Sequence, residues 1–380
     1  MWRTLLGRER KAAGRLVALS LSPPAAWTPR DYAAYVREGY ARNAVTHRCI
    51  RLIAEAVAAV PLRAGDQAEG SRRALDLINA PNPDEAGQEL LESFIGALQV
   101  AGNAYMEFAG GEEGPQALYM LRPDRMRVIA GPKGWADAWE YRAGGERRVF
   151  ERDRARARSP VLHMKLFNPG DDHYGLPPME AAARAVDVHN AGGAWAKALL
   201  DNAARPSGAL VVAGREGGDA RLTESQYERL KTELEELYTG PANAGRPLLL
   251  EGGLDWKPMG QSPSEMDFIE LRREAAREIA LAFGVPPMLL GLPGDNTYSN
   301  YKEANLAFHR QTVLPLARKT ARALSRWLSP WIGPALLEPE MELPASPGPE
   351  PVAPEEPSAR TAAPAPAADP AFLGRGEARR

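Results

Sequence analysis

The run from Ser262-Pro-Ser-Glu through Phe268-Ile-Glu-Leu-Arg-Arg-Glu-Ala-Ala-Arg to Ala282-Phe-Gly-Val-Pro-Pro-Met-Leu-Leu-Gly291 carries the clearest structural signals in the chain. Ser262, Pro263 and Glu265 suit the N-cap, first and third positions of a helix start. Gly284 and Pro286 end the helix after Phe283. We therefore predict a helix over 262–283, about 31 Å long.

The two faces of this predicted helix differ in polarity. Apolar residues recur at helical spacing, namely Phe268, Leu271, Ala275, Ile279 and Ala282. The opposite face mixes both signs of charge, with Arg272, Arg273, Glu274, Arg277 and Glu278. A helix of this kind packs on one face and meets polar surroundings on the other.

The segment after this helix is a loop rich in apolar residues. Residues 285–297 include Met288, Leu289, Leu290 and Leu292, with proline and glycine on both sides. The loop either presents these side chains to a partner or buries them against its own or a neighbouring subunit, and the sequence favours neither. A long helix is predicted from Ser299 to Leu328, with a kink at Pro315 because proline lacks the amide hydrogen that a helix interior needs.

The region before the 262–283 helix starts with another long helix. Residues 178–203 are rich in alanine, and Gly192-Gly193 in their middle allows a neighbouring helix to approach closely or the helix to bend. A strand is predicted at 208–212, and the capping box Thr223-Glu-Ser-Gln predicts a helix that ends near Tyr238. Strand patterns follow at 246–250 and 254–259.

The first half of the chain combines helices with short strands. Apolar residues at helical spacing predict helices over 43–60 and 86–100, with Cys49 on the buried stripe of the first. Five β-type runs at 104–108, 117–121, 125–129, 138–142 and 161–166 are separated by turn signals such as Gly144-Gly145. We therefore predict an α+β unit that ends near Phe167.

The composition excludes several classes of protein. Of 380 residues 44% are hydrophobic, and 47 Lys and Arg nearly balance 49 Asp and Glu, which disfavours gripping nucleic acid by bulk positive charge. No apolar run approaches the ~20 residues of a membrane span, and the start lacks the apolar region of a secretory signal. A single cysteine excludes an internal disulfide framework and fits a reducing cytoplasm.

Both ends of the chain are expected to lie outside the fold. Residues 1–42 form a basic, flexible arm, although its arginines would also suit an anionic surface. From Pro334 onward proline is dense and large apolar residues are few, so we place the end of the folded part near Trp331 and expect 331–380 to be disordered. A chain cut before Pro334 is accordingly expected to keep its assembly.

A search for reactive groups yields no catalytic residue, no cofactor site and no metal site. Phosphate-binding loops, dinucleotide fingerprints, nucleophile elbows and zinc-binding helices are all missing. The cluster Asp171-Asp172-His173 is interpreted as a turn rather than a metal site, and the remaining histidines as structural. The seven arginines of 142–158 are interleaved with acidic residues, which favours a solvated sheet edge, with a subunit contact as second interpretation.

Several motifs, in order, resemble one known family. They are Asn43 to Pro61, Leu77-Ile-Asn-Ala-Pro-Asn-Pro, Tyr174-Gly-Leu-Pro-Pro-Met-Glu, Asn202-Ala-Ala-Arg-Pro-Ser-Gly, Asn243-Ala-Gly-Arg-Pro-Leu-Leu-Leu-Glu-Gly-Gly, Ala282-Phe-Gly-Val-Pro-Pro-Met-Leu-Leu-Gly and Asn296-Thr-Tyr-Ser-Asn. Over roughly 43–328 the chain resembles tailed-phage portal proteins of the short siphovirus type, a family that also occurs in gene transfer agents.

This resemblance implies a portal fold and its division into parts. Residues 43–177 would form an α/β wing, 178–203 and 262–284 two stem helices, and 204–261 a small α/β clip. Residues 285–297 would be a tunnel loop and 298–330 a long kinked helix in place of a full crown. The resemblance further implies a ring oligomer, usually a dodecamer, through which double-stranded DNA passes without sequence specificity. Its implied partners are the major capsid protein, the terminase large subunit and a head–tail adaptor, in a virion or gene-transfer-agent particle assembled in the bacterial cytoplasm, with no membrane.

The resemblance also assigns roles to residues. Arg272, Arg273 and Arg277 would line the channel, and Ala275, Ala276 and Ile279 would pack the stem. Met288, Leu289, Leu290 and Leu292 would contact DNA. Two other hypotheses stay open at this point: a non-ring adaptor that binds partners through its proline-rich tail, and an enzyme of the packaging machinery.

Overall fold

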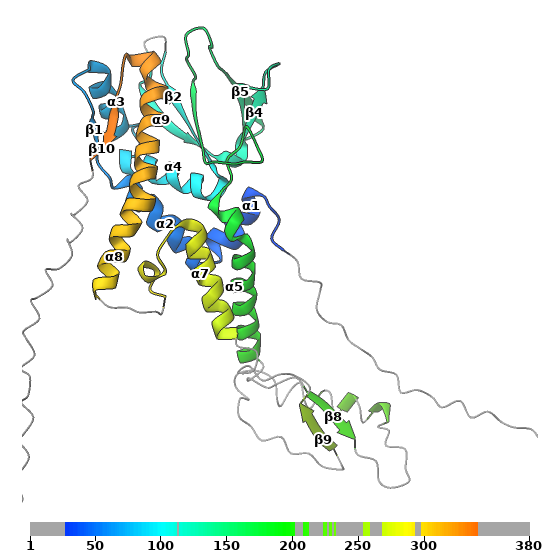
Figure 1. The fold of residues 1–380 in the computed structure, drawn as a ribbon. Helices are drawn as coiled ribbons and strands as arrows, with labels where there is room; N and C mark the ends of the chain where they lie inside the picture. Colours follow the sequence, from blue (N-terminus) through cyan, green and yellow to red (C-terminus); the bar gives the residue numbers. More distant parts are fainter. Residues whose placement is uncertain are drawn as a thin grey trace, which may run out of the picture. The chain divides into compact units, whose positions relative to one another are not determined.

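The computed structural model describes residues 27–111, 114–201, 208–212, 254–258, 268–292 and 298–340, with 223–225, 228–229 and 232. The described part combines helices with antiparallel sheets, as the α+β prediction requires (Figure 1). The predicted helix start at Ser262, Gln226 of the predicted capping box, the strand at 246–250 and most of the clip lie outside the described residues.

Helices α2 (Ala44–Ala58) and α4 (Gly87–Ala101) form the centre of the main core and confirm two predicted helices. Their buried side chains recur at helical spacing, with Cys49, Ile53 and Val57 on α2 and Leu90, Phe94 and Leu98 on α4. Burial raises the pKa of the Cys49 thiol to about 12, so this cysteine packs as a small apolar side chain. Helix α3 (Glu69–Asn79) was not predicted, and no side-chain hydrogen bond caps its start.

Two antiparallel three-stranded sheets account for the predicted β runs. One has the order β3-β2-β7, from β2 (Asn103–Ala109), β3 (Ala117–Leu121) and β7 (Val161–Lys165). The other has the order β4-β5-β6, from β4 (Met126–Ala130), β5 (Ala136–Ala143) and β6 (Glu146–Glu151). Tyr105, Trp139 and Phe150 belong to a second, smaller core cluster that links the two sheets.

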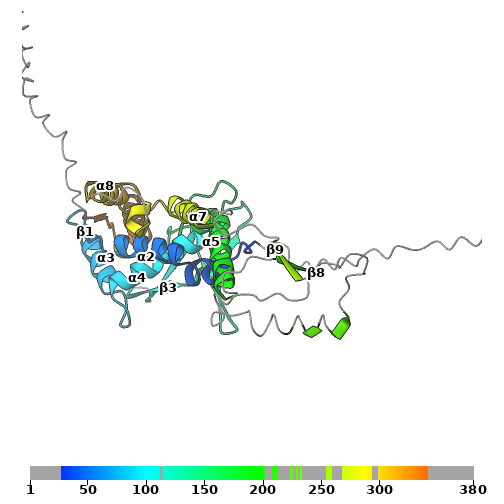
Figure 2. The ribbon, with the colours of Figure 1, turned by 90° about the horizontal axis from the view of Figure 1, so that it is seen from below.

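Helices α5 (Pro178–Asp201) and α7 (Phe268–Phe283) lie side by side, as Figures 1 and 2 both show. The first half of α5 reaches the main core through Met179, Ala182 and Val186, and the end of α7 reaches it through Ile279 and Phe283. Trp195 and Phe268 stack with ring centroids 3.9 Å apart. The small side chains of α5 therefore allow α7 to pack closely against it, as the alanine-rich pattern predicts.

The long helix after 297 has three parts. Helix α8 (Tyr298–Phe308) continues into a π-helical turn, η5 (His309–Val313), and then into α9 (Leu314–Ile332). Pro315 is the second residue of α9, so the regular α-helical hydrogen bonding is interrupted just before it. The wider π-helical turn accommodates the missing proline amide. The interruption thus falls at 309–313, slightly ahead of the predicted position.

The N-terminal boundary was predicted too late in the chain. Helix α1 (Tyr32–Ala34) runs into a π-helix, η1 (Tyr35–Ala41), ahead of Asn43. The side chain of Asp31 caps α1 by accepting a hydrogen bond from the Ala34 amide, and Ala34 and Tyr35 are buried. Residues 27–42 therefore belong to the folded part, and the basic residues of the predicted arm before them lie outside the described residues.

The C-terminal boundary was also predicted wrongly. Strand β10 (Leu337–Pro339) pairs antiparallel with β1 (Leu62–Ala64), and Leu337 is 1% exposed. The Leu337 amide donates to Ser325 Oγ at 2.9 Å and the Leu336 amide to Ser71 Oγ at 2.8 Å. One buried leucine and these specific hydrogen bonds hold a segment whose composition alone suggests disorder. A cut before Pro334 therefore removes part of the fold.

Candidate functional site

The three arginines predicted to line a channel do not share one face of α7. Arg273 is exposed and Arg277 lies partly exposed beside it. Arg272 turns toward α5 instead, where its Nε atom is buried without a hydrogen-bond partner among the described residues. A methyl group placed on Gly192 of α5 would lie 2.8 Å from Arg272 Cγ, so the glycine provides the space that the arginine stem occupies.

The outward face of α7 carries charges that neutralise one another. Glu270 pairs with Arg273, and Glu274 Oε1 lies 2.5 Å from Arg277 Nη1. Leu271 is 47% exposed and Leu281 80% exposed on the same helix. The predicted apolar stripe was therefore wrong at Leu271, whose place in the contact with α5 is taken by the stem of Arg272.

The residues predicted to pack the stem are buried within the chain itself. Ala275, Ala276 and Ile279 are 4%, 2% and 0% exposed. Ile279 belongs to the main core, in which α2 also takes part. A bulky substitution at any of these positions would therefore disturb the fold of a single chain before it disturbed any assembly.

The loop after α7 is short and well defined over residues 284–292. Gly284, with a φ of +67°, ends α7, and the amides of Gly284 and Val285 donate to Leu281 and Ala280 in the Schellman pattern. Pro287–Leu290 form a 3-10 helix. Leu289 and Leu290 pack against the main core, whereas Met288 and Leu292 do not join it. Residues 293–297 of the predicted tunnel loop lie outside the described residues.

A buried polar cluster joins α5 to the start of α2. Asn43 is 1% exposed and caps α2, because its Oδ1 accepts from the Thr46 amide at 3.0 Å. Its Nδ2 donates to His189 Nδ1 at 3.1 Å and to Asn190 Oδ1 at 3.0 Å. Burial and the nearby Arg272 lower the pKa of His189. The sequence offered one signal for this cluster, an asparagine directly before an apolar helical run.

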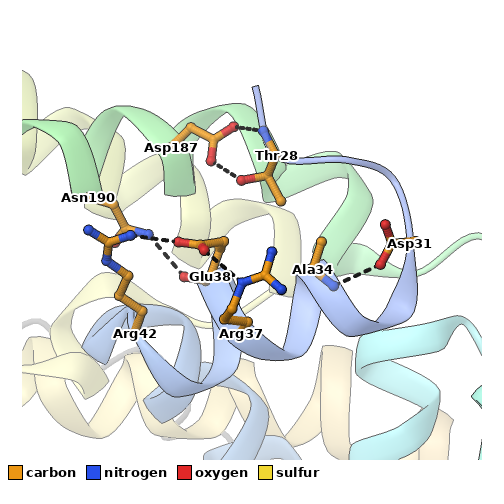
Figure 3. Close-up of polar contacts among 8 residues, drawn as sticks. All are labelled: Thr28, Asp31, Ala34, Arg37, Glu38, Arg42, Asp187 and Asn190. Carbon is orange, nitrogen blue, oxygen red and sulfur yellow. Dashed lines mark hydrogen bonds and ion pairs between the residues drawn. The ribbon is translucent and has the colours of Figure 1, made fainter. Parts of the chain in front are cut away.

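A second polar site lies where residues 27–42 meet α5 (Figure 3). Asp187 accepts hydrogen bonds from the amide of Thr28 at 2.9 Å and from its hydroxyl. Glu38 pairs with Arg37 at 3.0 Å and Arg42 at 2.9 Å, and these hydrogen bonds lower the pKa of Glu38. The residues border a pocket of about 290 Å³ that Trp27, Asn190 and Ala191 help to line. Sequence reasoning missed this site.

The cluster Asp171-Asp172-His173 forms a turn, as predicted. Asp171 Oδ1 accepts from the amides of His173 at 2.6 Å and Tyr174 at 2.9 Å, and these hydrogen bonds lower the pKa of Asp171. No group of three or more His, Cys, Asp or Glu side chains that could hold a metal ion occurs in the part of the chain that the structure describes. None of the described helices combines the length and apolar composition of a membrane span.

The arginine-rich run 142–158 is engaged within the chain. Arg142 and Arg147 both pair with the buried carboxylate of Glu140, and Arg148 pairs with Glu107 at 2.9 Å. The other four also have partners: Arg154 pairs with Asp137, Arg156 with Asp153, and Arg152 and Arg158 lie over the rings of Trp139 and Trp331. This arrangement supports the interpretation of a solvated, charge-balanced sheet edge.

Comparison with known proteins gives a consistent result. A family model described as phage portal protein matches residues 44–378. The chain is 52% identical to a chain in a solved neck of a native gene transfer agent particle computed with C12 symmetry, with a TM-score of 0.63 over 83% of this chain and 85% of that chain. It is 40% identical to an uncharacterized protein of Rickettsia bellii (strain RML369-C), over 76% of this chain and 74% of the relative.

A third relative carries a functional description. The chain is 26% identical over 342 residues to a probable portal protein of Streptomyces phage phiC31, which covers 83% of this chain and 71% of the relative. The paired helices α5 and α7, the 3-10 turn that follows them and the long interrupted helix agree with the portal fold that the motifs predicted. This chain belongs to the phage portal protein family.

Proposed function

We propose that this portal protein assembles with further copies of itself into a twelve-membered ring at one vertex of a phage or gene-transfer-agent capsid. Double-stranded DNA would pass along the axis of the ring during packaging and ejection. The observation that carries the proposal is the 52% identity to a chain of a neck computed with C12 symmetry.

Within this proposal α5 and α7 are the stem, and the outward face of α7 borders the channel. Arg273 and Arg277 are each paired with a glutamate, so DNA phosphates meet little unneutralised charge there. Each phosphate bound by a free Lys or Arg would strengthen retention of DNA and slow its passage. Arg272, which faces α5, would support the stem rather than contact DNA.

The loop at 284–292 would then have two parts with different roles. Leu289 and Leu290 pack on the core and anchor the loop, in line with the interpretation of a buried hydrophobic loop. Met288 and Leu292 are the remaining candidates for apolar contact with DNA. We further propose the major capsid protein, the terminase large subunit and a head–tail adaptor as partners, and no catalytic role for the chain itself.

Electron microscopy of the purified full-length protein tests the proposal. End-on views should show closed rings with a central hole, and mass measurement should give close to twelve copies. A protein that stays monomeric at micromolar concentration, or that forms assemblies without a hole, would contradict the ring. ATP hydrolysis or metal-dependent cleavage of DNA by the purified ring would contradict the absence of a catalytic role.

A further inference from the structure

The pocket between residues 27–42 and α5, which we call the strap pocket, has the composition of a protein-binding site. Trp27 at its rim is 59% exposed, and the side chains of Arg37 and Arg42 are 66% and 59% exposed. Tryptophan and arginine are the residue types most enriched among those that dominate binding energy at protein interfaces. The strap pocket is also held in shape, because Thr28 is bound to Asp187 and Asn190 to the carbonyl of Glu38.

The charges of the strap pocket select the kind of partner. Its two carboxylates are already used, Glu38 by the two arginines and Asp187 by Thr28. Arg37 donates through Nε and Arg42 through Nη1, so each guanidinium retains further N–H groups for a partner. Two positive and two negative groups leave the pocket neutral overall, which disfavours a polyanion such as DNA. The remaining N–H groups of the two arginines can bind one carboxylate, and Trp27 can pack against an apolar side chain.

One loop of the same chain offers this pair of groups. Phe167 is 83% exposed, more than any other large apolar side chain among the described residues. Asp172 is exposed, and its carboxylate has no partner in the described part of the chain, where only its carbonyl accepts a hydrogen bond from Lys165.

This loop is also held in one conformation. Asn168 Nδ2 donates to the Tyr174 carbonyl at 3.0 Å, and the Gly170 amide donates to Asn168 Oδ1 at 2.9 Å. Asp171 binds two further amides. A preorganised loop loses little conformational entropy when it binds.

Other exposed apolar side chains match the strap pocket less well. Trp135 is 69% exposed, but the nearby Asp137 is paired with Arg154. Leu281 is 80% exposed on α7, one turn from the exposed Glu278, but we have assigned the outward face of this helix to the channel. No residue of the loop 167–173 lines the strap pocket of its own chain. If this loop fills the strap pocket, a second copy must therefore supply it.

We infer that, in the ring, the loop 167–173 of one copy docks into the strap pocket of the next, with Phe167 against Trp27 and the Asp172 carboxylate on the guanidinium groups of Arg37 and Arg42. The inference rests on the proposed ring, because head-to-tail contacts between copies close a ring from two different surfaces on each chain.

A charge-swap experiment on the full-length protein tests this contact. The readout is the protein concentration at which half of the chains sediment as rings, with circular dichroism as a check on folding. Asp172→Arg should raise this concentration about tenfold or more, because it places like charges opposite each other, and Phe167→Ser should raise it about tenfold, because it removes the apolar contact with Trp27. Combining Asp172→Arg with Arg37→Glu should restore most of the loss. The matched control is Asp84→Arg, which reverses the charge of an exposed aspartate on another loop.

The possible results separate the contact from the ring. If the wild type forms rings and both loop variants assemble like Asp84→Arg, the contact is wrong and the proposed function stands. Loss of assembly without rescue by Arg37→Glu also overturns the contact. If the variants form normal rings that no longer bind another protein of the particle, the strap pocket binds that protein and not the loop. A wild type that never forms rings overturns the proposed function and this contact together.

Discussion

Asn43 uses every hydrogen-bonding position of its side chain. Its Oδ1 accepts from the amide and the hydroxyl of Thr46, and its Nδ2 donates to His189 and Asn190. A buried amide with all its partners contributes stability and fixes geometry, whereas one missing partner leaves a desolvated polar group. This residue therefore ties the start of α2 to α5, the helix that we assign to the stem.

His163 is a buried histidine of β7 that contacts both sheets. Its Nδ1 accepts from Trp139 Nε1 at 3.3 Å, its Nε2 donates to Asn103 Oδ1 at 3.0 Å, and its ring stacks on Tyr105. Burial lowers its pKa to about 3. A proton on Nδ1 would oppose the Trp139 N–H, which can only donate.

We predict that acid weakens the fold through this histidine. The unfolded chain takes up a proton near the ordinary pKa of about 6.5, while the folded chain does so only near 3. The contribution of neutral His163 is therefore complete above pH 6.5 and falls as the pH drops from 6.5 toward 3. By pH 5 the free energy of unfolding should have decreased by about 2 kcal/mol.

Denaturant unfolding at pH 7 and pH 5 measures this loss, and His163→Gln is its control. Glutamine offers a donor and an acceptor but does not titrate in this range, so the variant should lose markedly less stability between the two pH values. An equal pH dependence in wild type and variant would show that another group causes it.

The contact between α5 and α7 depends on one of two adjacent glycines. Gly192 faces the stem of Arg272, where a methyl group would lie 2.8 Å from Cγ, whereas the nearest atom to a methyl group on Gly193 is Arg272 Nη2 at 4.0 Å. The same dipeptide thus holds one position that requires glycine and one that tolerates alanine.

We predict opposite outcomes for alanine at these two positions. Gly193→Ala should raise the free energy of unfolding by about 0.5–1 kcal/mol, because alanine favours a helix interior. Gly192→Ala should be less stable than Gly193→Ala by about 1 kcal/mol or more, because Arg272 must move. Chemical denaturation of both variants measures the difference, and equal stabilities would place the helices further apart than described.

Strand β10 distinguishes two truncations of the C-terminal segment. A chain that ends at Glu340 keeps the pairing of β10 with β1 and the buried Leu337. A chain that ends at Gly333 loses both, and we expect its free energy of unfolding to fall by about 2–5 kcal/mol, the usual cost of removing a buried leucine side chain. Thermal unfolding of the two truncated proteins compares them. If the shorter chain is as stable as the longer one, β10 adds nothing to the fold.

In the proposed ring the balance of charge on α7 sets how firmly DNA is held. Arg273 and Arg277 carry their own carboxylates on the same helix, one turn away. Exposed pairs of this kind add little to stability. Repeated around a ring, however, these pairs lower the net positive charge that faces the DNA phosphates. The ring then binds DNA weakly enough for the DNA to move through it.

Removing these carboxylates should increase the affinity of the ring for DNA. The variant Glu270→Gln with Glu274→Gln removes two negative charges per chain from beside Arg273 and Arg277, so rings should bind double-stranded DNA more tightly and with a steeper dependence on salt. Filter binding across a range of salt concentrations measures both effects. The control is Glu69→Gln with Asp84→Asn, which removes two exposed carboxylates elsewhere. Identical salt dependence in both variants would place α7 away from the DNA.

Much of this protein could be predicted from periodicity and terminal signals. The repeat of apolar residues located α2, α4 and most strands, and Gly284 with Pro286 located the end of α7, because these patterns act over a few residues. Other features depend on residues far apart in the chain. Arg272 turns inward because Gly192 lies opposite, and Leu337 is ordered because β1 and Ser325 receive it. The same holds for Thr28 with Asp187 and for Asn43 with His189: their hydrogen bonds join segments more than one hundred residues apart, and no local pattern encodes such a pairing.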